Sequence, residues 1–135
     1  MIEAEWILSV SDDVLVLRQK IFGVGADVLD ESAFHLVAFY NQKPVACLRL
    51  LALLDQYRID FLGVLPDFRG FGVGDLLVRL AIRAAYDMGA DELRLSSPKS
   101  VLGFFEKLGF IKNKINKENF EMSRKGDISG HCAKL

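Results

Sequence analysis

The segment Arg69-Gly70-Phe71-Gly72-Val73-Gly74 places an arginine and three alternating glycines directly before a helical pattern. At the start of a helix, the first backbone N–H groups have no intrahelical acceptor, and the helix dipole is positive there. Glycines keep side chains away from these amides, so a pyrophosphate can lie directly against them. Arg69 can add a charge-assisted hydrogen bond. These residues predict an anion-binding turn, and the alternative is a structural turn that binds no ligand.

Two other phosphate-binding motifs do not fit this segment. A P-loop needs GxxxxGK[S/T], and no Lys-Ser or Lys-Thr pair follows the glycines. A dinucleotide-binding GxGxxG motif counted from Gly70 or Gly72 ends on Asp75 or Leu77 instead of glycine. The pattern that remains is R-x-x-G-x-G followed by a helix, which favours a bound pyrophosphate over an empty turn.

The elements that position this turn follow from the spacing of apolar residues. Short β-rich runs predict strands at 4–10, 34–40, 44–53, 57–65, 91–97, 110–115 and 119–125. Helices are predicted at 11–22, 73–88 and 98–109. In the first helix, Val14, Leu17, Arg18 and Ile21 follow at helical spacing. Residues 23–33 are predicted to be a loop or a short helix, and 126–135 a loose tail.

This order of elements, β-α-β-β-β-α-β-α-β-β, predicts an α/β protein of the α+β type with a mixed sheet and helices on both faces. Asn41, Gln42 and Lys43 between two strand-like runs indicate a β-hairpin. Pro66 ends the strand before the glycine turn, because proline cannot donate a ladder hydrogen bond. We expect one domain over residues 1–125, since no linker or repeat interrupts the pattern.

Two segments of this pattern resemble those of the GNAT superfamily of N-acetyltransferases. "VLPDFRGFGVGDLL" (64–77) closely resembles its coenzyme A pyrophosphate loop, and "VLGFFEKLGF" (101–110) is similar to its later helix and turn. "LDESAFHLVAF" (29–39) is similar to one branch of small bacterial members, and "FEMSRK" (120–125) resembles the final strand. The resemblance covers most of the chain, from the first helix to about residue 125.

The resemblance implies a splayed, mostly antiparallel sheet in which strand 57–65 diverges from strand 91–97. The pantetheine arm of acetyl-CoA would lie in that gap and pair with the backbone of Leu62 and Val64, much as an added strand would. The amides around Gly70 to Asp75 would hold the pyrophosphate, and two phenylalanines would lie near the arm. The residues so assigned to the co-substrate are Leu62, Gly63, Val64, Arg69, Gly70, Phe71, Gly72, Val73, Gly74, Asp75, Phe104 and Phe105.

Acyl transfer to an amine needs a group that accepts the proton of the amine. In this family a carboxylate on the strand before the loop often serves, and Asp60 matches that position. Strand alternation predicts that Asp60 shares a face with Leu62 and Val64. The alternative is an ordinary surface aspartate beside Arg58.

The sequence departs from the family pattern in three places. Phe105 stands where many members have a tyrosine, and a phenyl ring has no proton to give to the leaving thiolate. Tyr57 and Tyr86 are weak substitutes, at the far end of a strand and on the long helix. Phe71 stands where a basic residue is common, and Asp75 adds a negative charge in the first helical turn. These departures keep open a non-catalytic acyl-CoA-binding module and a fold that binds nothing.

Other polar residues carry plainer interpretations. Asp27, Asp30 and Glu31 lie in the loop that borders the acceptor site in this family. They can attract a cationic amine, although a solvated loop face is favoured. His35 is expected to be a packed or edge histidine. Cys47 and Cys132 form no CxxC or Cys/His cluster, so reduced thiols and no metal site are expected.

Composition excludes several classes of function. The chain has 135 residues, a formal net charge of -1 and 51% apolar residues, which indicates a globular protein without the charge for nucleic acid. Its apolar runs are shorter than a membrane span, and its N-terminal acids do not fit a secretory signal. We therefore expect a cytoplasmic acetyltransferase with a small-molecule or peptide amine as acceptor. Exposed sheet edges are compatible with a homodimer.

Overall fold

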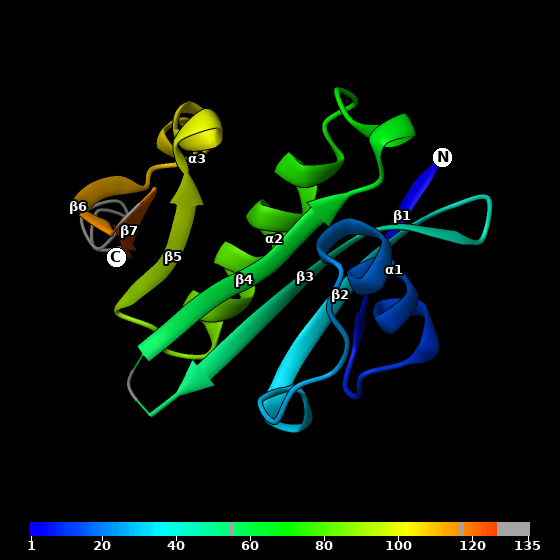
Figure 1. Cartoon of the computed structure of the whole chain (residues 1–135). Helices are drawn as coiled ribbons and strands as arrows, with labels where there is room; N and C mark the ends of the chain where they lie inside the picture. Colours follow the sequence, from blue (N-terminus) through cyan, green and yellow to red (C-terminus); the bar gives the residue numbers. More distant parts are fainter. Residues whose placement is uncertain (55, 117, 127–135) are drawn as a thin grey trace.

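The computed structural model describes residues 1–54, 56–116 and 118–126, which form a seven-stranded sheet with helices on both faces (Figure 1). The strand order is β1-β2-β3-β4-β5-β7-β6. The elements are β1 (Ile2–Ile7), α1 (Asp12–Phe22), β2 (Ala33–Tyr40), β3 (Lys43–Leu53), β4 (Gln56–Val64), α2 (Val73–Asp87), β5 (Glu92–Pro98), α3 (Leu102–Lys107), β6 (Ile111–Asn116) and β7 (Asn119–Lys125). Every strand pair is antiparallel except β4–β5 in this part of the chain.

The predicted order of strands and helices is confirmed, with small shifts at the boundaries. β1 starts and ends earlier than predicted, and Pro98 closes β5 instead of opening the next helix. Residues 23–33 hold one short 3₁₀ turn, Asp30–Ser32. The predicted loose tail lies outside the described residues except Gly126, whose N–H donates to the Asp91 carbonyl at 3.1 Å.

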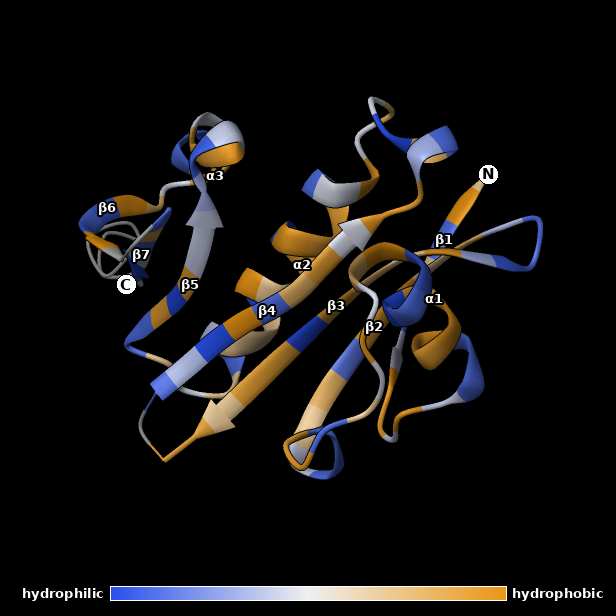
Figure 2. Cartoon of the chain, in the orientation of Figure 1, coloured by the Kyte–Doolittle hydropathy of each residue, from blue (hydrophilic) through white to orange (hydrophobic). Residues whose placement is uncertain are grey.

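Local signals set the ends of several elements. The Ser11 hydroxyl caps α1 by accepting from the Val14 amide at 3.4 Å, and Gly23 ends the helix in a left-handed conformation at φ 70°. Asn41 and Gln42 also have positive φ, the geometry of a tight two-residue hairpin, so the predicted β2–β3 hairpin is confirmed. Figure 2 shows this turn as hydrophilic and the central strands as largely hydrophobic.

The sheet buries a separate apolar cluster on each face. The larger cluster packs α2 and α3 against the sheet and includes Leu36, Leu48, Leu50, Ile59, Leu77, Val78, Leu93, Phe105 and Met122. The smaller one packs α1 against the other face through Val14, Leu17, Val37 and Cys47. Because successive residues of a strand alternate between faces, a side chain's cluster shows which face it occupies.

The sheet opens between β4 and β5. Within the described residues, these two strands pair at Tyr57 with Leu93 and at Arg58 with Arg94, and then diverge (Figure 1). Beyond Arg58, the edge of β4 that faces β5 carries no ladder partner. The predicted splayed sheet is therefore confirmed, and the Arg58–Glu121 ion pair ties β4 to β7 at the closed end.

Candidate functional site

The glycine turn leads from the open end of β4 to the first turn of α2. Gly70 and Gly72 have φ of 85° and 81°, a region that strains any residue with a Cβ atom. Gly72 is the N-cap of α2 and has no side chain with which to accept from the amides that follow it. The first-turn amides of α2 are thus left for an anion, in the place where the sequence predicts the pyrophosphate.

The charged residues next to the glycine turn have hydrogen-bond partners outside it. Nε of Arg69 donates to the Val64 carbonyl at 2.8 Å, so this arginine fastens the turn to the end of β4. Asp75 accepts from Nε of Arg79 at 2.7 Å, which offsets the carboxylate charge beside the helix start. Phe71 is 78% exposed and stands at the tip of the turn. Arg69 and Asp75 therefore both have hydrogen-bond partners within the protein.

One of the two predicted phenylalanines reaches the turn. A methyl group added at Gly74 would lie 3.7 Å from Cζ of Phe104 and 3.7 Å from a methyl of Val64, so α3, β4 and α2 meet at this point. Phe105 is only 6% exposed, and its ring lies 5.0 Å from that of Phe104 and 5.9 Å from that of Phe110. Phe104 therefore lies beside the glycine turn, whereas Phe105 belongs to the core.

Leu62, Gly63 and Val64 form the end of β4, which pairs with β3 on one edge and has no ladder partner on the edge that faces β5. The side chains of Leu62 and Val64 pack on the α2 face of the sheet. Gly63 faces α1, where an added methyl group would lie 2.6 Å from Cγ2 of Ile21 and 3.0 Å from the Phe22 ring. Glycine at this position lets α1 approach the strand, a role that the sequence prediction did not include.

The predicted orientation of Asp60 is wrong. Cys47 pairs with Gly63 but Arg49 pairs with Asp60, so β4 holds one extra residue between these pairs. Phe61 has a left-handed φ of 47° within this β-bulge. Because of the bulge, Asp60 and Phe61 both face α1, opposite to Leu62 and Val64. Asp60 nevertheless stays two residues beyond the last β4–β5 pair, where the two strands begin to diverge.

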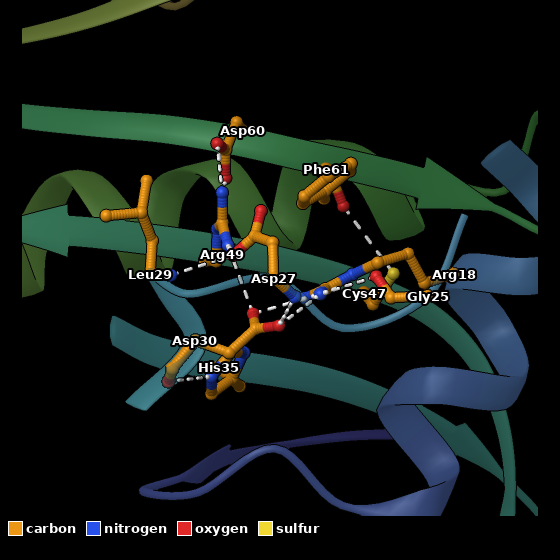
Figure 3. Close-up of polar contacts among 10 residues, drawn as sticks. All are labelled: Arg18, Gly25, Asp27, Leu29, Asp30, His35, Cys47, Arg49, Asp60 and Phe61. Atoms are coloured by element: carbon orange, nitrogen blue, oxygen red, sulfur yellow. Dashed lines mark hydrogen bonds and ion pairs between the residues drawn. The ribbon is translucent and has the colours of Figure 1, made fainter. Parts of the chain in front are cut away.

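Asp60 is part of a cluster of charged residues beneath α1 (Figure 3). Arg49 donates to both carboxylate oxygens of Asp60 at 2.8 and 2.7 Å, to Asp27 at 2.6 Å and to Asp30 at 3.0 Å. Arg18 donates to both oxygens of Asp30 at 2.9 and 2.8 Å. We call Arg18, Asp27, Asp30, Arg49 and Asp60 the ion cluster.

Phe61 completes the ion cluster as its apolar wall. The Arg18 and Arg49 guanidinium carbons lie 4.4 and 4.7 Å from the centre of its ring. Contacts of this kind stabilise a cation on an aromatic face. The bulge therefore places Asp60 and Phe61 on the same face of β4, toward the arginines of the cluster.

The predicted solvated face for the 27–31 loop is wrong for Asp30. Its side chain is 2% exposed and that of Arg18 is 1% exposed, whereas Asp27 stays partly open at 40%. His35 is buried with Nε2 3.0 Å from the Asp30 carbonyl oxygen, which confirms the packed histidine. Sequence signals for the cluster existed, because Arg18 follows the apolar spacing of its helix and Arg49 interrupts an apolar strand.

Burial and hydrogen bonding shift the pKa values of three side chains in this region. Burial raises the pKa of Asp30, but hydrogen bonds from Arg18, the Asp27 amide and Arg49 outweigh it and lower that pKa to about 2. The hydrogen bond from Arg49 also lowers the pKa of Asp27. Burial raises the pKa of the Cys47 thiol to about 11, so this cysteine is not a thiolate nucleophile near neutral pH.

The two tyrosines that could replace the missing acid are engaged elsewhere. The Tyr57 hydroxyl donates to the Met88 carbonyl at 3.2 Å, and the Tyr86 hydroxyl donates to the Arg124 carbonyl at 2.6 Å. In the described part of the chain, no group of three or more His, Cys, Asp or Glu side chains is placed to hold a metal ion. No helix among the same residues is long and apolar enough to span a membrane.

Comparison with known proteins agrees with this geometry. The family described as "Acetyltransferase (GNAT) family" matches residues 5–110, and the chain therefore belongs to the GNAT acetyltransferase family. A relative from Bacillus subtilis (strain 168), named "Putative acetyltransferase BSU40680", is 26% identical over 84 residues, which are 62% of this chain. The chain spans 57% of the length of that relative.

Solved structures show the same fold. An acyl-CoA N-acyltransferase from Pseudomonas aeruginosa superposes with a TM-score of 0.80 at 23% identity, over 92% of this chain and 99% of the other. A GNAT family acetyltransferase from Elizabethkingia anophelis, solved with acetyl-CoA bound, gives 0.75 at 15% identity, over 92% of this chain and 97% of the other. The predicted fold class is confirmed by these superpositions.

Proposed function

We propose that this chain binds acetyl-CoA or a related acyl-CoA and transfers the acyl group to an amine. The observation that carries the proposal is the start of α2, which has no side-chain cap, beside the β5-facing edge of β4, which has no ladder partner beyond Arg58. The amides from Gly70 to Asp75 would hold the pyrophosphate, and the backbone of Leu62 to Val64 would pair with pantetheine. The acetyl-CoA bound to the Elizabethkingia protein of the same fold supports this choice of co-substrate.

The proposed chemistry is direct attack. The amine nitrogen forms a bond to the thioester carbonyl carbon, the carbon–sulfur bond breaks, and the coenzyme leaves as a thiolate. We assign Asp60 as the group that takes the amine proton, directly or through a water molecule. Its carboxylate is 33% exposed, and each oxygen keeps a lone pair beyond its bond to Arg49. The thiolate would be protonated from solvent, because Phe105 has no proton to give.

The ion cluster suits a cationic acceptor. It contains three carboxylates and two guanidinium groups, so it carries one net negative charge, and its open members are Asp27 and Asp60. A primary ammonium group is attracted to such a surface before it loses its proton. A small-molecule or peptide amine therefore remains the proposed acceptor.

The rival function is a non-catalytic acyl-CoA-binding module. The observations that favour it are the engaged hydroxyls of Tyr57 and Tyr86 and the firm hold of Arg49 on Asp60. Turnover of acetyl-CoA over a panel of primary amines separates the two functions. Binding without turnover of any amine would support the module.

The first experiment is calorimetric titration with acetyl-CoA of the unmodified chain and of Gly72→Glu, which puts a carboxylate in the pyrophosphate cradle. Gly89→Glu is the matched control, because Gly89 also has a left-handed φ, at 102°, and open space around it, but lies after α2. We expect Gly72→Glu to abolish binding and Gly89→Glu to keep it. Absence of binding by the unmodified chain would reject both the transferase and the module.

Asp60→Asn then tests the proton acceptor. The amide preserves the size of the side chain, and its oxygen can still accept from Arg49. We expect kcat to fall by about 10²-fold or more while acetyl-CoA affinity stays unchanged, since general-base catalysis contributes about 10²–10⁴-fold. An unchanged kcat would remove Asp60 from the mechanism.

A further inference from the structure

Several cationic side chains gather away from the glycine turn, between α2 and the end of α3. A cavity of about 400 Å³ is open there, and we call it the basic groove. It is lined by Arg79, Ile82, Arg83, Lys107, Leu108, Gly109 and Arg124. Four of these residues are cationic and none is acidic, although the whole chain has a net charge of -1.

Arg124 is held in place for this groove. Its Nε donates to the Leu108 carbonyl at 2.9 Å, and its guanidinium carbon lies 5.4 Å from the centre of the Tyr86 ring. A methyl group on Gly109 would lie 2.8 Å from the same Nε, and Gly109 has a φ of 94°. Two constraints therefore require glycine at position 109: its left-handed φ and the closeness of the Arg124 side chain.

The other cations of the groove can be released to a ligand at low cost. Arg79 pairs with Asp75 and Arg83 with Asp87 across exposed helix turns, and the Arg83 pair is long at 3.8 Å. Such exposed pairs contribute little to stability, so an anion of higher charge can replace them. Among the described residues, Lys107 and Arg124 have no carboxylate within ion-pair distance.

We propose that the basic groove is a second anion site, which binds a phosphate monoester. A monoester carries up to two negative charges and three acceptor oxygens, which suits several converging cations. Ile82 and Leu108 add an apolar floor for a group attached to the phosphate. Arg79 lies about 9 Å along α2 from the helix start, at 1.5 Å per residue, so the groove is close to the glycine turn but separate from it.

Two sources can supply this chemistry. One is the 3′-phosphate of the coenzyme, and this version rests on the proposed function. The other is an independent phosphate or phosphorylated compound. The two differ in one measurable way, because only the first makes coenzyme A bind more tightly than dephospho-coenzyme A.

The test is calorimetric titration, at fixed ionic strength, of the unmodified chain with coenzyme A, dephospho-coenzyme A and inorganic phosphate. The same titrations are made on the double variant Arg83→Gln/Lys107→Gln, which leaves Arg124 and the glycine turn intact. Lys112→Gln/Lys114→Gln on β6 is the matched control, since it removes the same charge from an exposed strand. Phosphate is titrated both with and without saturating dephospho-coenzyme A.

We expect coenzyme A to bind about tenfold or more tightly than dephospho-coenzyme A, because charge-assisted hydrogen bonds are the strong ones. The preference should be lost in Arg83→Gln/Lys107→Gln and kept in the control. Phosphate binding that only the groove variant loses, without a preference between the coenzymes, also supports the site and assigns it to an independent ligand. Equal coenzyme affinities together with no groove-dependent phosphate binding would overturn the proposal. If neither coenzyme binds, the proposed function fails, and the phosphate titration still decides the groove.

Discussion

Two regions next to β4 differ in how far their polar groups are paired within the protein. On the α1 side, Arg49 makes hydrogen bonds to three aspartates, and Nη1 of Arg18 donates to both carboxylate oxygens of Asp30. At the end of the strand, the glycine turn leaves the first amides of α2 without a side-chain cap. Among the buried side-chain nitrogen and oxygen atoms of the described residues, Arg18 Nε and His35 Nδ1 have no hydrogen-bond partner.

This comparison separates polar groups that the fold itself pairs from polar groups that it leaves without a side-chain partner. A buried charge without a partner is costly, so the pairing of the buried Arg18, Asp30 and Arg49 is explained by the fold itself. The amides at the start of α2, which have no side-chain cap, have no such explanation. The contrast yields three predictions. The first changes a residue of the ion cluster, the second changes the protonation of that residue, and the third changes one glycine in each region.

Asp30→Asn should have the largest effect. It leaves Arg18 and Arg49 buried with less opposing charge, and removal of one partner from a buried pair costs about 3–5 kcal/mol. Urea denaturation measures the loss in the free energy of unfolding. Asp87→Asn is the control, since its pair with Arg83 is exposed, and should cost less than about 1 kcal/mol. Equal losses for the two variants would show that the ion cluster is not a buried structural unit.

Acid should weaken the same cluster without any mutation. The folded pKa of Asp30, about 2, lies below its ordinary value of 3.8, so its stabilisation is full above pH 3.8 and is lost as the pH falls through 2. The loss is on the order of 2 kcal/mol for this group. Denaturation midpoints at pH 6, 4, 3 and 2 measure it. A midpoint that stays constant from pH 4 to 2 would contradict the pairing.

A glycine-to-alanine change should lower the stability of the fold at position 63 and raise it at position 74. Gly63→Ala forces a methyl group against Ile21 and Phe22 and should destabilise the fold by about 1–3 kcal/mol. Gly74→Ala meets only ordinary contacts at 3.7 Å in the first turn of α2 and should stabilise by about 0.4–1 kcal/mol. Thermal unfolding of both variants measures the difference. Destabilisation of equal size would mean that α1 does not need a glycine beneath it.

The sequence predicted what depends on neighbouring residues. The β2–β3 hairpin and the glycine turn are each encoded within a few positions, and the structure has them where expected. The splay of β4 from β5 came from the family resemblance, because strand runs alone do not give their pairing. Asp75 was expected to add a negative charge in the first helical turn, and the Arg79 pair that offsets this charge follows from their spacing of four residues.

What the sequence could not predict depends on residues that are distant along the chain. Nothing in "RIDFLGV" marks Phe61 for a left-handed conformation, and that single residue reverses the face of Asp60. The ion cluster joins a helix, a loop and two strands, so its partners cannot be read from local spacing. A charged residue inside an apolar pattern, as at Arg18 and Arg49, was the one usable signal.

The short contact between β4 and β5 also has a consequence for how the chain folds. β2, β3 and β4 are joined by hairpins, as are β6 and β7, whereas the two β4–β5 pairs must close a loop that contains all of α2. Closing a long loop costs chain entropy before any contact offsets it. We expect the two halves of the sheet to form first and to join last, so the gap would be the seam between two folding units. In hydrogen exchange, the amides along this seam should open at lower free energy than those of β2 and β3.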